Sequence, residues 1–173
     1  RMNETLEAIA QATFKEWFID FNYPGATGEL VPSPLGPIPK EWQAIPLDQI
    51  AFFLNGLALQ KYPPQPGETP LPVIKIKELR TGVTKSSDVA SRSIPEQYIV
   101  KNGDLLFSWS GSLETMIWAG GEGALNQHLF KVTSEQYSLW FVYMWIKYHL
   151  PSFRAIAADK ATTMGHIKRN NLS

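Results

Sequence analysis

Short apolar runs divided by glycines constrain this chain more than any other feature. "DLLFSWS" (104–110), "TMIWA" (115–119) and "QHLFKV" (127–132) are separated by Gly103, Gly111 and the glycines of 120–123. Glycine at that density is typical of tight turns. The runs therefore predict short strands of a sheet.

A further strand is predicted from the alternation in "PVIKIK", residues 72–77. Ile74 and Ile76 would share one face, with Val73, Lys75 and Lys77 on the other, solvated face.

Two helices flank these strands. Apolar residues recur at helical spacing over 4–20, with Asn3 as the N-cap. After the strands, Thr133 and Gln136 match a capping box, and the apolar run to Leu150 ends before Pro151. The second helix is rich in aromatic residues on most sides, so we expect it to lie against the sheet.

A proline- and glycine-rich segment, 22–40, joins the first helix to the strands. Its five prolines predict a linker without regular structure. The organisation we expect is a helical arm over 1–21, this linker, and one globular domain over 41–173.

Composition excludes several classes of protein. With no cysteine, the chain has no disulfides, thiolate zinc sites or cysteine nucleophiles, and a cytoplasmic location fits. The longest apolar run, 139–146, is far shorter than the roughly 20 residues of a membrane span. The 16 basic and 16 acidic side chains give a formal net charge of zero, which argues against a strongly basic, indiscriminate nucleic-acid binder.

Catalytic motifs are missing from the sequence. "WSGS" (109–112) lacks the glycine pattern of a nucleophile elbow, the three histidines are far apart, and no phosphate-binding glycine loop precedes a helix. Asp104 and Glu114 have no lysine-containing carboxylate cluster around them. We therefore expect a binding module without catalytic residues or metal. The residues alone leave two ligands open, a carbohydrate bound on aromatic side chains or DNA bound on a polar, basic surface.

Five segments, in order along the chain, resemble the specificity subunits of type I restriction-modification systems. "NETLEAIAQATFKEWFIDF" resembles the end of their central helix, and "LGPIPKEWQAIPLDQIA" the beginning of a target recognition domain. "GDLLFSWSG" and "LNQHLFKV" are similar to two marked strands of that domain, and "TTMGHIKRNNL" to its end.

The resemblance implies an α+β fold: a twisted, largely antiparallel sheet with packed helices, preceded by one helical arm. It implies a non-catalytic domain, the C-terminal one of its subunit, that reads one half of a bipartite DNA site. Its partners would be double-stranded DNA, methyltransferase subunits and the restriction and translocation subunit. S-adenosylmethionine, ATP and Mg²⁺ would belong to those partners. We expect the chain to be part of a longer protein.

The resemblance also directs the search for DNA-binding residues. Asn126, Gln127 and His128 lie in a segment shared by domains with different targets, so we expect them to fix loops or touch phosphate. Base reading is expected within 54–62, 75–85, 111–115 and 164–169. The predicted DNA-binding residues are Lys61, Tyr62, Lys75, Lys77, Arg80, Lys85, Ser110, Ser112, His166, Lys168 and Arg169.

The first helix carries an apolar stripe that one helix cannot bury on itself. Its members are Leu6, Ile9, Phe14, Trp17 and Phe18, which we predict to bind a partner. Burying each large side chain is worth about 1.5–3 kcal/mol. We therefore predict self-association through residues 1–21, measured by sedimentation velocity with and without those residues. A strictly monomeric chain whose behaviour ignores the deletion would contradict this.

Overall fold

The computed structural model describes residues 2–159, which form two units, one ending at Pro46 and one beginning at Leu47. The helices are α1 (Met2–Phe14), continued by a π-helical turn (Lys15–Ile19), α2 (Leu47–Ile50), α3 (Ile76–Thr81) and α4 (Leu139–Asp159). Short 3-10 turns cover Leu59–Lys61 and Glu96–Tyr98. The strands are β1 (Leu30–Val31), β2 (Ile38–Pro39), β3 (Phe52–Asn55), β4 (Leu71–Ile74), β5 (Val89–Ala90), β6 (Ile99–Val100), β7 (Leu105–Ser108), β8 (Thr115–Ile117), β9 (Gly123–Leu125) and β10 (Leu129–Thr133).

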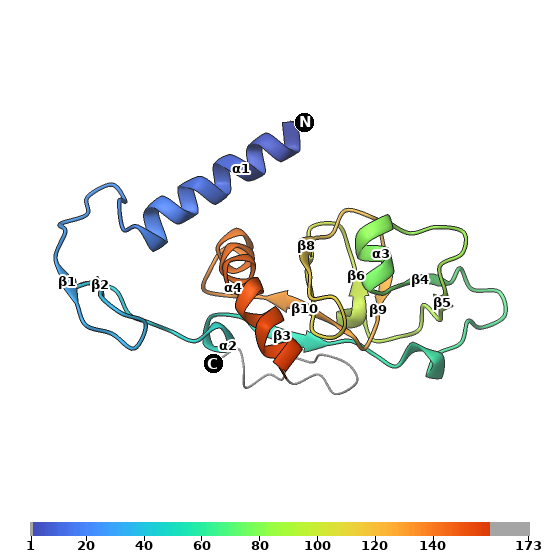
Figure 1. Cartoon of the computed structure of the whole chain (residues 1–173). Coiled ribbons are helices and arrows are strands. Elements are labelled where there is room, and N and C mark those ends of the chain that lie inside the picture. Colours follow the sequence, from blue (N-terminus) through green and yellow to red (C-terminus); the bar gives the residue numbers. More distant parts are fainter. Residues whose placement is uncertain (1, 160–173) are drawn as a thin grey trace. The chain divides into compact units, whose positions relative to one another are not determined.

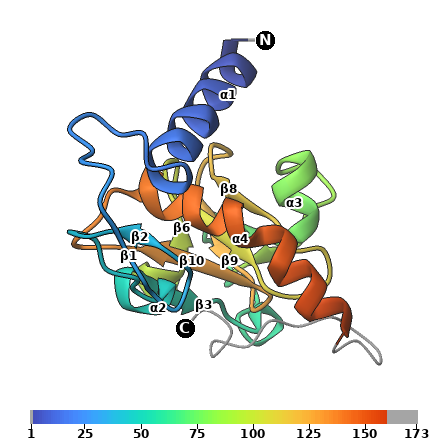
Figure 2. The same cartoon turned by 60° about the vertical axis from the view of Figure 1, so that its left-hand side comes forward.

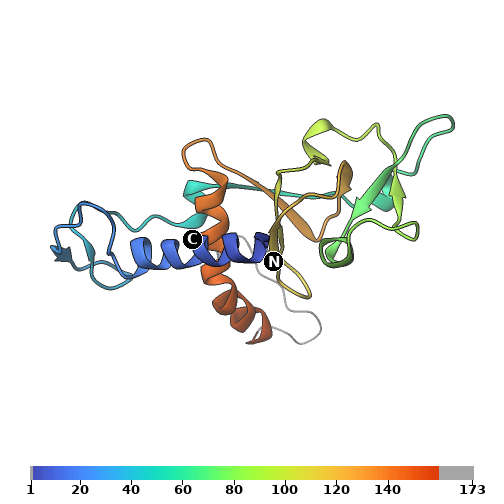
Figure 3. The same cartoon turned by 90° about the horizontal axis from the view of Figure 1, so that it is seen from above.

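In the first unit, the proline-rich segment turns back around the end of α1 (Figure 3). Trp42 packs on Phe18, Phe21 and Tyr23, with ring centroids 5.1–5.6 Å apart. β1 and β2 pair antiparallel, so the prediction that no regular element survives in 22–40 is wrong. Ser33 closes the turn between the two strands, because its hydroxyl donates to the Gly36 carbonyl at 2.6 Å.

The predicted partner-binding stripe divides into two parts. Phe14 is buried and its ring contacts that of Phe18, which is half-buried. Leu6 and Ile9 are 60% and 58% exposed, and Trp17 is 38% exposed. The apolar surface that remains for a partner is therefore concentrated on the N-terminal turns of α1.

The second unit contains two four-stranded sheets, in the orders β3-β10-β7-β8 and β5-β4-β9-β6 (Figure 1). All pairs are antiparallel except β4 with β9. The predicted α+β fold with a largely antiparallel sheet is confirmed. The strands divide into two sheets, however, where the prediction had one.

The core has three layers. α2 and α4 cover one face of the first sheet, and α4 crosses that face in Figure 2. Phe53, Phe107 and Phe130 fill this layer, with ring centroids 5.8–6.5 Å apart. A second cluster, which includes Leu71 and Ile99, lies within the second sheet. The third cluster draws residues from both sheets: Ile74, Leu79, Val100, Leu106, Trp118, Leu125 and Leu129.

β7 is therefore buried on both faces. Leu105 and Phe107 join the layer under α4, while Leu106 joins the layer shared by the two sheets. The continuous apolar run in "LLF" is the sequence signature of such a strand.

α4 differs from its predicted bounds at both ends. Ser138 is the N-cap and accepts a hydrogen bond from the Phe141 N–H at 3.3 Å, whereas Thr133 ends β10. The helix also continues through Pro151. Proline removes one backbone donor, but the turns beyond it are held because Phe153 and Ala157 are buried in the core.

The two sheets are joined where two chain segments cross. β9 leads into β10 through Asn126–His128. β3 leads into Leu57, which forms an isolated parallel β-bridge with Asn126. Gly56 lies at the crossing: a Cβ there would come within 2.2 Å of the Asn126 carbonyl oxygen. Only glycine permits that approach.

We predict that Gly56→Ala lowers the free energy of unfolding by about 3 kcal/mol. This is the upper end of the range for overpacking, because the Asn126 backbone atoms that the new Cβ would meet cannot rotate away as a side chain can. Denaturant unfolding measures the change. Gly67→Ala is the matched control: its Cβ meets no atom, so it costs only the strain of a positive φ, roughly 1 kcal/mol. A Gly56 variant as stable as the Gly67 variant would contradict the role of the crossing.

Candidate nucleic-acid interface

The predicted strand over 72–77 ends at Ile74, and Lys75 begins α3 as its N-cap. The buried Glu78 carboxylate explains the change, because it accepts hydrogen bonds from the Lys75 N–H at 3.2 Å and from the Ser87 hydroxyl at 2.9 Å. The prediction that Lys75 and Lys77 share a strand face is therefore wrong. An acidic residue three positions after a helix start is a capping signal, and the sequence contained it.

Four of the predicted DNA-binding residues gather on α3 and the loop that follows it. We call Lys75, Lys77, Arg80 and Lys85 the α3 patch. Lys75 forms an ion pair with Asp88, and Arg80 with Glu114. Within the described part of the chain, Lys77 and Lys85 have no carboxylate at ion-pair distance, and Lys77 lies 3.4 Å from the Ser86 hydroxyl.

The ion pairs favour the charged forms of Asp88 and Arg80. A hydrogen bond from Lys75 lowers the pKa of the Asp88 carboxyl, and the positive charges of Lys75 and Lys77 act in the same direction. The hydrogen bond to Glu114 raises the pKa of the Arg80 guanidinium.

Lys61 and Tyr62 lie at the end of the 3-10 turn Leu59–Lys61, and both are exposed. The Tyr62 carbonyl accepts a hydrogen bond from the Ser91 N–H at 2.8 Å, which ties this turn to the second sheet. In the same turn, the exposed Gln60 lines a pocket that Lys75 of the α3 patch also lines.

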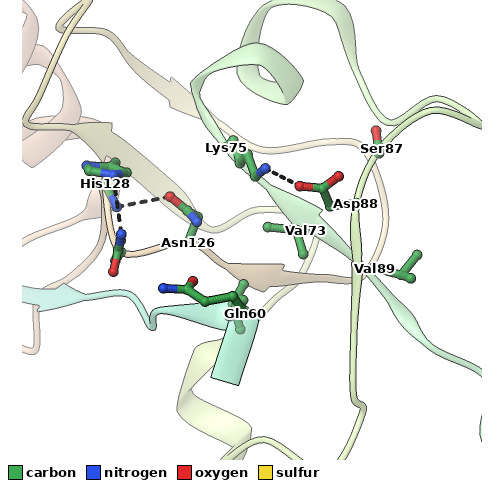
Figure 4. Close-up of a pocket in the computed structure, with 10 residues that line it drawn as sticks. Gln60, Val73, Lys75, Ser87, Asp88, Val89, Asn126 and His128 are labelled. Carbon is green, nitrogen blue, oxygen red and sulfur yellow. Dashed lines mark hydrogen bonds and ion pairs between the residues drawn. The ribbon is translucent and has the colours of Figure 1, made fainter. Parts of the chain in front are cut away.

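This pocket has a volume of about 640 Å³ and is lined by side chains from four segments (Figure 4). It joins two of the segments expected to read bases, 54–62 and 75–85, through Gln60 and Lys75. Its lining residues are Leu59, Gln60, Val73, Lys75, Ser87, Asp88, Val89, Asn126, Gln127 and His128.

The Asn126–His128 turn forms one side of the pocket and is fixed by hydrogen bonds. The Asn126 amide oxygen accepts from the His128 N–H at 3.2 Å, and the Gln127 N–H donates to the Leu57 carbonyl at 2.9 Å. The side chain of His128 lies 2.9 Å from the hydroxyl of Ser110. These contacts agree with the expectation that the three residues fix a loop.

The predicted serines take different positions. Ser110 is buried and bonded to His128. Ser112 is exposed and lines a second pocket, of about 440 Å³, together with Arg80 and Arg154. The Arg154 guanidinium donates to the Leu113 carbonyl at 2.8 Å, which holds the turn before β8 against α4. The predicted His166, Lys168 and Arg169 lie outside the described residues.

Sequence reasoning missed Asp88 and Arg154, and it included Gln60 only as part of the segment 54–62. Asp88 is not a candidate from the sequence, because nothing local indicates that a residue 13 positions after Lys75 lies beside it. Arg154 lies beyond Pro151, where the helix was expected to have ended.

Over residues 2–159, no three histidine, aspartate or glutamate side chains converge as metal ligands. Within the same range, the helices are all too short or too polar to cross a membrane.

Comparison with known proteins shows which kind of protein this chain resembles. No protein-family model matches the chain. The chain is 28% identical over 137 residues to the type I restriction enzyme EcoBI specificity subunit of Escherichia coli. The match covers 78% of this chain and 28% of that subunit, so the chain spans under a third of its relative.

Two solved structures share the fold. The HsdS subunit from Thermoanaerobacter tengcongensis superposes with a TM-score of 0.52 at 16% identity, over 98% of this chain and 37% of that one. A chain from a structural study of complex assembly and conformational transition in the type I R-M system gives 0.50 at 17% identity, over 99% and 41%. The resemblance to specificity subunits of type I restriction-modification systems is confirmed.

The loop between Tyr62 and β4 depends on one carboxylate. Glu68 accepts hydrogen bonds from the Gln65 N–H at 2.6 Å, the Ser91 hydroxyl at 3.1 Å and the Arg92 N–H at 3.2 Å. The pKa of Glu68 is lowered, chiefly by the Gln65 N–H and against a smaller opposing effect of burial.

A lowered acid pKa stabilises the fold above the unfolded value of 4.5, and the effect is lost as the pH falls through the folded pKa. We predict that the protection factors of the Gln65 and Arg92 amides, which compare their exchange rates with those of the unfolded chain at the same pH, fall below pH 4.5 and that Glu68→Gln removes this pH dependence. Glu135→Gln, at an exposed acidic residue, is the control. Parallel acid loss of protection in the wild type and the Glu68 variant would contradict the assignment.

Proposed function

We propose that this chain recognises a specific DNA sequence as a target recognition domain of a type I restriction-modification specificity subunit. It would read one half of a bipartite target site and perform no catalysis itself. The observation that carries the proposal is the match over 137 residues to the EcoBI specificity subunit, together with the shared HsdS fold.

The surface chemistry supports the same function. Lys77 and Lys85 stand exposed, without a carboxylate partner in residues 2–159, next to a pocket lined by amide, hydroxyl and charged side chains. Lysines positioned for phosphate and polar groups positioned for base edges are the two components of a sequence-reading interface.

The chemistry of restriction and modification would belong to partner subunits. We propose that methyltransferase subunits and a restriction and translocation subunit assemble with the full-length protein, and that S-adenosylmethionine, ATP and Mg²⁺ bind to them. The exposed part of α1, with Leu6 and Ile9, is the surface that we assign to a subunit contact.

The carbohydrate-binding alternative is not favoured. Most tryptophans that suggested it have packing roles: Trp42 lies in the aromatic cluster of the first unit, Trp118 is buried, and Trp109 and Trp145 pack against the core under α4.

We predict that replacing Lys77 and Lys85 by Ala weakens duplex DNA binding to a similar extent for all sequences. The slope of log affinity against log salt should become shallower by about 0.9 for each phosphate that is no longer neutralised. Fluorescence anisotropy over a salt series measures both quantities.

The matched control replaces Lys15 and Lys40, which form ion pairs in the first unit, and removes the same charge. Equal losses in the two double variants would show only a general charge effect. Glycan binding that ignores salt, with no duplex binding, would overturn the proposed function.

A further inference from the structure

We infer that the Lys75–Asp88 ion pair reads the edge of one base pair and is a specificity-determining element of the chain. The inference rests on the proposed function and deepens it, because it separates residues that read sequence from residues that contact phosphate. It follows from the position of the pair, its chemistry and its contrast with the other lysines of the α3 patch.

The pair lies at the mouth of the larger pocket, on firmly held backbone. The side chains of Lys75 and Asp88 are 43% and 64% exposed, so both remain accessible to a ligand. The Asp88 carbonyl accepts a hydrogen bond from the Val73 N–H at 2.7 Å, and the Lys75 N–H is held by Glu78. Figure 4 shows the two charged groups meeting above Val73. Both side chains are thus presented from fixed positions.

The chemistry of the pair matches a base edge better than a phosphate. Phosphate oxygens only accept hydrogen bonds, so an ionised carboxylate beside the lysine would repel them. A base pair in the major groove presents acceptors and donors side by side: N7 and the N6 amino group in adenine, or guanine O6 beside the cytosine N4 amino group. An ammonium donor next to a carboxylate acceptor complements either pattern.

Asp88 is held in the acceptor form. An aspartate is ionised at neutral pH, and the hydrogen bond from Lys75 lowers its carboxyl pKa further. Across the pocket, Gln60 adds an exposed amide with both a donor and an acceptor, the type of side chain that pairs with adenine. By contrast, Lys77 and Lys85, which have no carboxylate partner within residues 2–159, suit phosphate.

The test is to select preferred sequences from a randomised duplex library with the purified chain, and then to repeat it with Asp88→Ala and with Lys75→Met. We expect both variants to lose preference at the same base position, by roughly five- to a hundredfold, with other positions unchanged. Asp88→Ala removes a negative charge and Lys75→Met removes a positive charge. A loss of stability would not make both variants lose preference at the same base position.

Glu96→Ala is the matched control, because it removes another exposed carboxylate paired with a lysine, Lys101, that lines neither of the two pockets described. If Asp88→Ala tightened binding to every sequence equally, the carboxylate would merely shield a phosphate contact, and the inference would be wrong. Binding indistinguishable from that of the Glu96 variant would also overturn it. A wild-type chain without sequence preference would defeat the proposed function itself, and the inference with it.

Discussion

The close approach of Gly56 to the backbone of Asn126 is the contact on which the rest of the second unit depends. Two segments distant in sequence meet at this point: 123–133 passes from β9 of the second sheet to β10 of the first, and Leu57, two residues after β3, forms a bridge with Asn126. Hydrogen bonds from the Leu57 N–H to the Leu125 carbonyl and from the Gln127 N–H to the Leu57 carbonyl hold the crossing. A side chain at position 56 would force the strands apart, so the relation between the sheets is set by backbone atoms.

A charged pair inside the layer shared by the sheets reinforces this relation. Lys131 follows the inward-facing Leu129 by two residues on β10, and its side chain is only 16% exposed. Its ammonium group lies 2.8 Å from the Asp104 carboxylate and 3.0 Å from the Ile99 carbonyl, so it joins β10 to β6. Asp104 also accepts a hydrogen bond from the Lys101 N–H. Each charged group therefore has hydrogen-bond partners in the protein, which a charge largely removed from water requires.

The local elements were predictable where neighbouring residues decide them. Glycines marked the turns around β7, β8 and β10, and spacing marked α1, because sterics and periodicity act over a few residues. The end of the strand at Ile74 was not predicted, because the alternation of Ile and Lys continued into a helix that begins by capping with Glu78. The C-terminal bound of α4 failed for a different reason, because the tertiary burial of Phe153 outweighs the local effect of Pro151.

The candidate site was only partly predictable. The resemblance to specificity subunits suggested which lysines could meet DNA, but not that Asp88 and Gln60 would share a pocket with Lys75, since that depends on how three separate segments pack. The division into two sheets was hidden because no local signal marks the crossing at Gly56.

The way α3 begins has a consequence for how such a domain can change. Glu78 caps the helix through the backbone N–H of Lys75, and the Lys75 side chain takes no part in that hydrogen bond. Every residue except proline has that N–H. The position can therefore vary in side chain while the helix start is kept, and the same holds for Asp88, whose backbone carbonyl carries the contact to Val73. Backbone atoms of Lys75 and Asp88 hold the scaffold, while their side chains form the recognition surface proposed above, so binding preferences could change here without rebuilding the fold.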